Sequence, residues 1–198
     1  GSFRRADEGD YRCSDDEVRR MLADQSDTPA DSQIVEHFGQ ADFDPETVKQ
    51  YRNRFASRAP DHPWLLLDDA ALLTKLSALR RDRATGLEGA TVAGLLMFGR
   101  FEALREALPG FHVDYRERLS DDPAVRWTDR VVPDGTWENN LFQFYLRVMQ
   151  RLSGDLKMPF QLDRELYRKD DSAVHEALRE AVVNALVHGR VVLAVQLP

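Results

Sequence analysis

The most regular pattern of apolar and polar residues lies near the end of the chain, between Ser172 and His188. Its apolar positions recur at helical spacing in one stripe, formed by Val174, Leu178, Val182 and Leu186. Its polar positions recur every fourth residue on another side, at Glu176, Glu180, Asn184 and His188. Asp171 or Ser172 can cap the start, and Gly189 can end the segment. The pattern predicts one long helix with an apolar stripe and a polar row.

Further patterns precede and follow this segment. Helical spacing and capping residues predict helices over 14–22, 44–59, 70–79, 90–98 and 138–152. Alternation of apolar and polar residues predicts a strand over 111–118 and a weaker one over 125–132. The apolar stretch 191–196 is typical of a short buried strand. We therefore predict an α+β fold, with helices in the majority and a small, mostly antiparallel sheet.

The composition is that of a globular chain. Its 198 residues, 42% of them hydrophobic and 31% charged, suffice for one domain or two small ones with a sizeable core. The apolar stretches are shorter than a membrane span and no signal peptide is apparent, which predicts a cytoplasmic protein. A net charge of −7 argues against the whole chain being a nucleic-acid-binding surface, because phosphate binding needs clustered Lys and Arg.

The densest basic run, Arg80–Arg83, is the best candidate in the sequence for a local phosphate contact. Asp82 and Glu88 dilute its charge. A charged, solvated loop is therefore the favoured interpretation of this run.

Three classes of site find no support in the residues present. The glycines of the 94–99 stretch are followed by Arg100 and Phe101, where a phosphate-binding loop needs Lys and then Ser or Thr. The single cysteine, Cys13, excludes an internal disulfide and a cysteine-rich metal site. The five histidines do not pair at metal-ligand spacing.

The polar row of the 172–188 segment has a chemical interpretation. The Asn184 carboxamide oxygen can ligate a hard cation such as Mg²⁺, and Glu180 can orient or deprotonate a water beside a phosphate. The structural alternative is a solvated helix edge, since such rows are common on amphipathic helices.

The segment Arg179-Glu-Ala-Val-Val-Asn-Ala-Leu-Val-His188 resembles the N box of GHKL-type ATPases, a helix with the motif Glu-x-x-x-Asn-Ala. More narrowly, they are similar to bacterial transcriptional regulators in which a Schlafen-type AlbA-like domain precedes a linking region and a RecG C-terminal-related, ATPase-like domain. Thr91-Val-Ala-Gly-Leu-Leu-Met-Phe-Gly-Arg100 resembles a phrase of that linking region. Segments similar to this family occur from about residue 10 to residue 188, and two of these segments are specific.

The resemblance implies ATP and Mg²⁺ as cofactors. Asn184 would be the metal ligand, Glu180 the water-orienting base, and His188 would lie close to the nucleotide. It also implies that 1–13 hold a tag remnant and the end of the AlbA-like domain, 14–155 the helical linking region, and 156–198 the start of the ATPase-like module.

The resemblance implies a fragment of an ATP-binding transcriptional regulator, with nucleotide state coupled to conformation or to DNA binding supplied elsewhere. No Asp-x-Gly-x-Gly adenine-binding motif occurs in the 198 residues, so we expect this chain alone to be inactive as an ATPase. The alternative is a non-catalytic scaffold or dimerisation module with a degenerate nucleotide site. Direct DNA binding is disfavoured by the acidic charge balance.

Overall fold

The structure is a computed structural model that describes residues 3–6, 9–15, 18, 29–122, 124–155, 173–188 and 192–195. At 3–6, 9–10, 154–155, 173–175, 188 and 192–195 it describes the backbone alone. The fold is α+β, as the sequence predicts. The α-helices are α2 (Pro45–Arg58), α3 (Asp69–Lys75), α4 (Val92–Phe98), α5 (Phe101–Ala107), α6 (Leu141–Asp155) and α7 (Ala173–His188). Short 3₁₀ helices are η1 (Ala30–Ser32), η2 (Gln40–Asp42) and η3 (Pro63–Leu66).

The described strands form three small sheets. They are β1 (Phe3–Ala6), β2 (Gly9–Arg12), β3 (Leu79–Arg81), β4 (Glu88–Ala90), β5 (Asp114–Glu117), β6 (Asp129–Val131) and β7 (Val192–Val195). The pairs β1–β2 and β3–β4 are antiparallel. The third sheet has the order β6-β5-β7, with β6 antiparallel and β7 parallel to β5. The sheets are thus mostly antiparallel, with one parallel pair joined by a long connection through α6 and α7.

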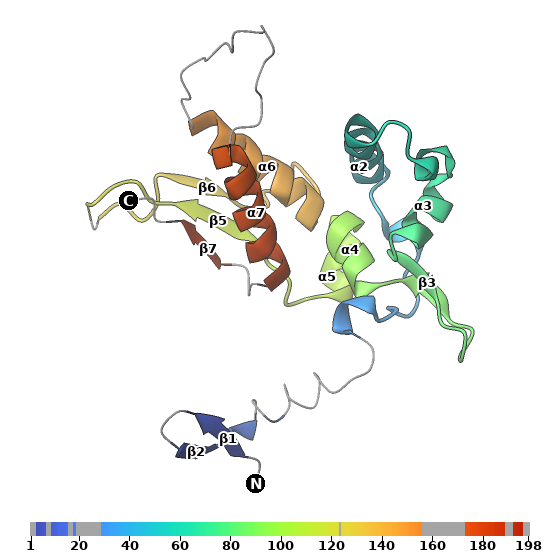
Figure 1. Cartoon of the computed structure of the whole chain (residues 1–198), viewed down its shortest axis with the longest axis horizontal. Coiled ribbons are helices and arrows are strands. Elements are labelled where there is room, and N and C mark those ends of the chain that lie inside the picture. The colour runs from blue at the N-terminus through green and yellow to red at the C-terminus, as the bar shows by residue number, and fades with distance from the viewer. Residues whose placement is uncertain are drawn as a thin grey trace, which may run out of the picture.

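Two apolar clusters make up the core. The first lies among α2 to α5 and the β3–β4 hairpin; its buried members include Phe43, Val48, Leu73, Leu95, Phe98 and Leu104. The second joins α6 and α7 to one face of the β6-β5-β7 sheet; its buried members are Val113, Tyr115, Val131, Phe144, Val148, Leu152 and Val182. Figure 1 shows α6 and α7 side by side next to this sheet, with α2 to α5 on the other side of α6. Phe111 packs against both clusters.

A buried polar joint connects α2 with the start of α6. The Asn140 side-chain amide donates to the Gly99 carbonyl at 3.1 Å and to Thr47 Oγ1 at 3.3 Å. Gln143 Nε2 donates to Thr47 Oγ1 at 3.2 Å and to Gln50 Oε1 at 3.0 Å. Since a buried polar group without a partner costs about 1–3 kcal/mol, these bonds favour one placement of α6 on α2.

A second contact connects the residues before α6 with α5. The Phe101 backbone N–H, at the start of α5, donates to Glu138 Oε2. Burial raises the pKa of the Glu138 carboxyl, and the carboxylates of Asp44 and Glu102 act in the same direction. The hydrogen bond to Phe101 holds the residues before α6 against the start of α5.

The observed element ends agree with several predicted caps. The side chains of Asp44 and Asp68 accept the N–H groups of Thr47 and Ala71, at 2.8 and 2.7 Å, and cap α2 and α3. The predicted end of α3 at residue 79 is wrong: the helix ends at Lys75 and Ser77 has a φ of 59°. The helix predicted over 14–22 falls largely outside the described residues.

Substitution of Gly94 tests how closely α4 packs against Ala78. A Cβ at this position would meet backbone atoms of Ala78, among them Cα at 2.8 Å, and backbone cannot move aside as a flexible side chain can. Gly94→Ala is expected to lower the free energy of unfolding by about 1–3 kcal/mol, measured by urea denaturation. Gly110→Ala, where the Cβ would meet nothing within 4 Å, is the control. Equal stability of the two variants would contradict the close approach.

Candidate functional site

Helix α7 is anchored by one side. Val182 is 3% exposed and belongs to the second cluster, with Leu186 packed against that cluster one turn later. Leu178 is partly buried, as the predicted stripe requires, and the side chain of Val174 lies outside the described residues. The apolar stripe of the sequence is therefore confirmed at Val182, Leu178 and Leu186.

The polar row lies on the side of α7 opposite Val182. Glu176, Glu180 and Asn184 are all exposed, and positions 180 and 184 are one turn apart on the same side. The side chain of His188 lies outside the described residues. The structure thus places Glu180 and Asn184 next to each other in solvent, which is compatible both with a ligand site and with a solvated helix edge.

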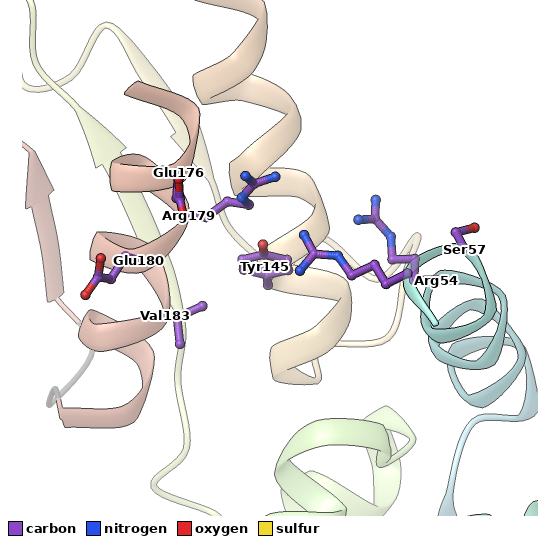
Figure 2. A pocket seen from close by; sticks show the side chains of 8 residues that line it. Arg54, Ser57, Tyr145, Glu176, Arg179, Glu180 and Val183 are labelled. Carbon is purple, nitrogen blue, oxygen red and sulfur yellow. The ribbon is translucent and has the colours of Figure 1, made fainter. Parts of the chain in front are cut away.

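An opening of about 1150 Å³ separates α7 from α2. Its lining residues are Arg54, Ser57 and Arg58 of α2, Tyr145 of α6, and Glu176, Arg179, Glu180 and Val183 of α7. Figure 2 shows Arg54 and Ser57 on one side, Glu176, Arg179 and Val183 on the other, and Tyr145 between them. The Glu180 carboxylate lies at the rim and points away from Tyr145. Asn184 is not among the lining residues.

The α2 side of the opening is basic. Arg54 and Arg58 are exposed and stand one helical turn apart at the C-terminal end of α2. Within the described part of the chain, neither makes an ion pair, a hydrogen bond or a ring contact, whereas Arg179 does make an interaction. The sequence alone does not single out this pair. The spacing of four residues was the available signal, but it could not show what the pair faces.

The basic run at 80–83 has a different environment. Arg80 donates to the Ser32 carbonyl at 3.1 Å, and Arg81 pairs with Glu88 at 3.2 Å. Hydrogen bonds from the Ala84 N–H and the Thr85 hydroxyl lower the pKa of Asp82. The run occupies β3 and the turn to β4, and two of its arginines already have acceptors on the chain.

The oxygen atoms of Glu180 and Asn184 on α7 could supply some, but not all, of the ligands that a metal–nucleotide complex needs. Asn184 and Glu180 offer a carboxamide oxygen and a carboxylate to solvent, which suits Mg²⁺, because this ion takes few protein ligands and completes its shell with water and phosphate oxygens. Among the described residues, no group of three His, Cys, Asp or Glu side chains is placed to hold a metal by itself. Any Mg²⁺ on this face would therefore depend on the phosphates of its ligand.

An apolar recess of about 430 Å³ adjoins the same helix. Its lining includes Leu96 and Met97 of α4, Leu141 and Phe142 of α6, and Val183, Leu186 and Val187 of α7. Val183 is 44% exposed and Val187 is 69% exposed. Exposed apolar residues beside an apolar recess are typical of a surface that another chain can cover.

Comparison with known proteins extends the description of the fold. Residues 19–114 match a protein family described as a domain of unknown function (DUF8451). No match is found among proteins with curated descriptions. Among solved structures, the chain is similar to the DIP2311 protein from Corynebacterium diphtheriae, with 17% identity and a TM-score of 0.54 over 93% of this chain.

The matched part is 33% of the DIP2311 chain, so this chain spans about a third of the length of that protein. At this identity the likeness concerns the fold alone. As a separate observation, none of the helices in the described ranges is both long and apolar enough to cross a membrane.

Mutations can distinguish the buried side of α7 from its solvent-exposed side by their effects on stability. Val182→Ala removes two buried methyl groups and is expected to lower the free energy of unfolding by about 1–3 kcal/mol. Glu180→Ala, on the solvent side, is expected to change it by less than about 0.5 kcal/mol. Chemical denaturation of the two variants measures both values. A larger loss for Glu180→Ala than for Val182→Ala would show that the helix presents its faces the other way round.

Proposed function

We propose that this chain is part of a cytoplasmic, ATP-binding transcriptional regulator whose nucleotide state is coupled to conformation or to DNA binding by regions outside these 198 residues. The observation that carries the proposal is the exposure of Glu180 and Asn184, one turn apart, on a helix whose other side is anchored in a core. The resemblance of this helix to the N box of GHKL-type ATPases supports it as an analogy.

The proposed roles follow the chemistry of the side chains. Asn184 Oδ1 is a neutral ligand for Mg²⁺, Glu180 orients a water or accepts its proton, and His188 would lie near the nucleotide. Bound Mg²⁺–ATP would supply the electrophilic phosphate and the remaining metal ligands. Anchoring by Val182 fixes the helix that carries both groups, so only their side chains, and not the backbone, would need ordering when the ligand binds.

Coupling requires that the ligand favour one arrangement of the protein over another. The α6–α7 layer is attached to α2 through the joint of Thr47, Asn140 and Gln143. A ligand held by α7 would therefore act on a layer that is firmly connected to the residues matched by the DUF8451 family.

The site itself is tested in the full-length protein that contains this chain. Wild-type protein is expected to bind ATP only with Mg²⁺, and Asn184→Ala is expected to weaken this binding at least about tenfold, equivalent to about 1.4 kcal/mol, because it removes the metal ligand. Isothermal titration calorimetry measures the affinity. Gln150→Ala, which removes an exposed carboxamide from the neighbouring helix α6, is the matched control. Equal affinities of the Asn184→Ala and Gln150→Ala variants would remove Asn184 from the site.

A second candidate function, a dimerisation module without nucleotide, is favoured by one observation. Val183 and Val187 expose apolar surface on the same helix, next to the recess lined by Leu141 and Phe142. A second copy presenting the same valines to this recess would bury that surface in a symmetric contact.

The dimerisation candidate has its own test. Val187→Lys is expected to convert a dimer to a monomer, because a charge in an apolar contact is costly. Sedimentation velocity of the full-length protein measures the oligomeric state. Leu119→Lys, at an apolar residue that is 57% exposed in the loop between β5 and β6, is the control. A wild-type monomer at all accessible concentrations would rule this candidate out.

A further inference from the structure

The apolar recess between α4, α6 and α7 is bordered by residues that pack on both core clusters. Leu96 and Met97 of α4 pack against the first cluster, whereas Leu141 of α6 and Leu186 of α7 pack against the second. The three helices meet at this recess (Figure 1). A molecule that fills the recess therefore contacts both layers of the protein at once.

The size of the recess suits a small molecule. A cavity of about 150 Å³ holds one benzene ring, so the recess of about 430 Å³ is large enough for an apolar body of roughly eight to ten carbon atoms. Sites for small molecules are typically concave and mostly apolar, with few polar groups, and they often lie between packed helices. Met97 adds an unbranched side chain that can adapt to the shape of a ligand.

One charge distinguishes the recess from a purely apolar surface. Among the described residues that line it, Asp31 of η1 is the one that carries a charge. Asp31 is exposed, and its side chain makes no ion pair or hydrogen bond within the described part of the chain. A cationic group at the rim would be attracted by this carboxylate, while an apolar body attached to it would leave water for the recess. The lining therefore matches an amphipathic ligand with a positive head group.

A second copy of the chain matches this charge less well. In a symmetric contact the same surface comes from both subunits, so two Asp31 carboxylates would enter one interface. Like charges brought together in this way disfavour association. The chain as a whole also has a net charge of −7, which repels another copy and attracts a small cation.

We propose that the recess binds a small amphipathic cation, with its apolar body between α4, α6 and α7 and its ammonium group beside Asp31. The inference goes beyond the proposed function and does not rest on it, because neither Glu180 nor Asn184 lines the recess. Since the ligand contacts both layers, it stabilises their relative placement and acts as an effector of the protein.

Eight-carbon probes with different head groups test the two parts of the ligand in the full-length protein. At neutral pH octylamine is a cation, as a lysine side chain is, octanol is neutral and octanoate is an anion. Octylamine is expected to bind about two- to fivefold more tightly than octanol, which is the range of an exposed ion pair, and octanoate is expected to bind most weakly. Isothermal titration calorimetry below the micelle concentration of each probe measures these affinities. Equal binding of octylamine and octanoate would overturn the proposed cation.

The length of the probe tests the apolar body. Hexylamine is expected to bind about 10- to 20-fold more weakly than octylamine, because each buried methylene strengthens binding about fourfold. Octylamine is also expected to raise the melting temperature, since it binds the folded protein. Equal affinities of hexylamine and octylamine would show that the alkyl chain stays in water and would overturn the proposal.

Substitution of Asp31 tests the head-group contact. Asp31→Lys is expected to reverse the order of the charged probes, so that octanoate binds more tightly than octylamine, and to leave octanol binding unchanged. Asp61→Lys is the matched control, because Asp61 is exposed in the turn before η3 and does not line the recess. It is expected to keep the wild-type order. Reversal in both variants would indicate a general charge effect, and either this result or reversal in neither would overturn the assignment to Asp31.

A larger side chain in the recess tests its location. Ala93 of α4 lines the recess and is partly buried, so the indole of Ala93→Trp would occupy the space of the ligand. This variant is expected to bind both octylamine and octanol at least about tenfold more weakly without a lower melting temperature. Unchanged octylamine binding by the folded variant would overturn the proposal. Asp31→Lys changes an exposed residue and keeps the proposal testable if Ala93→Trp does not fold.

Two further results separate this inference from the other functions. Absence of binding of every probe, in a protein that is dimeric and becomes monomeric on Val187→Lys, would overturn the proposal and assign the recess to a second copy. Asn184→Ala is expected to bind octylamine as wild type does. Octylamine binding in a protein that does not bind ATP would support this inference and remove the proposed function, whereas ATP binding without octylamine binding would overturn this inference alone.

Discussion

The arrangement of the molecule depends on the hydrogen bonds that Asn140 and Gln143 make with Thr47. These side chains are buried, so separating α6 from α2 would leave their polar atoms without water or protein as a partner. Asn140 also accepts the backbone N–H of Gln143 at 2.9 Å and so caps the first turn of α6. One set of side chains therefore begins a helix and places it on α2 at the same time.

The placement of α6 on α2 determines the relative positions of the residues that line the opening. Tyr145 lies on α6 shortly after the joint, while Arg54 and Arg58 lie on α2 one to two turns beyond Gln50, which completes the hydrogen-bonded set. Tyr51 of α2 adds an aromatic contact with Phe142 of α6, with ring centroids 5.7 Å apart. Since α7 packs on α6 and the sheet, the distance between the α2 side and the α7 side of the opening is set by this packing.

The sequence predicts the elements whose signals are local. The spacing within 172–188 predicts α7 and the separation of Val182 from Glu180, and Asp44 followed by Pro45 predicts the start of α2. The end of α3 is mispredicted because the apolar spacing continues to residue 79, whereas Leu79 pairs with Ala90 in a strand. The predicted start of α6 at Glu138 is three residues early, since Asn140 and Glu138 make contacts with distant parts of the chain. Pairing and long-range contacts have no local signal.

Only the part of the candidate site that lies on α7 was predictable from the sequence. A helical row such as Glu180 and Asn184 is visible in the sequence because it lies on a single element. Arg54 and Arg58 are two of 27 basic residues, and their relation to α7 depends on α6, which lies some 90 residues later in the chain. The Arg80–Arg83 run is the densest basic run of the sequence, yet Ser32 and Glu88 already bind two of its guanidinium groups. Density in sequence is thus a poor measure of the charge that remains available to a ligand.

The ring of Phe111 has a consequence of its own, because it contributes to both apolar clusters. The two layers of the molecule share this side chain, so the unfolding of either layer would expose apolar surface of the other to water. Their stabilities are therefore not independent quantities that add. Destabilisation of the α2–α5 layer therefore also destabilises the layer that carries α7, through an apolar contact and not only through the polar ones.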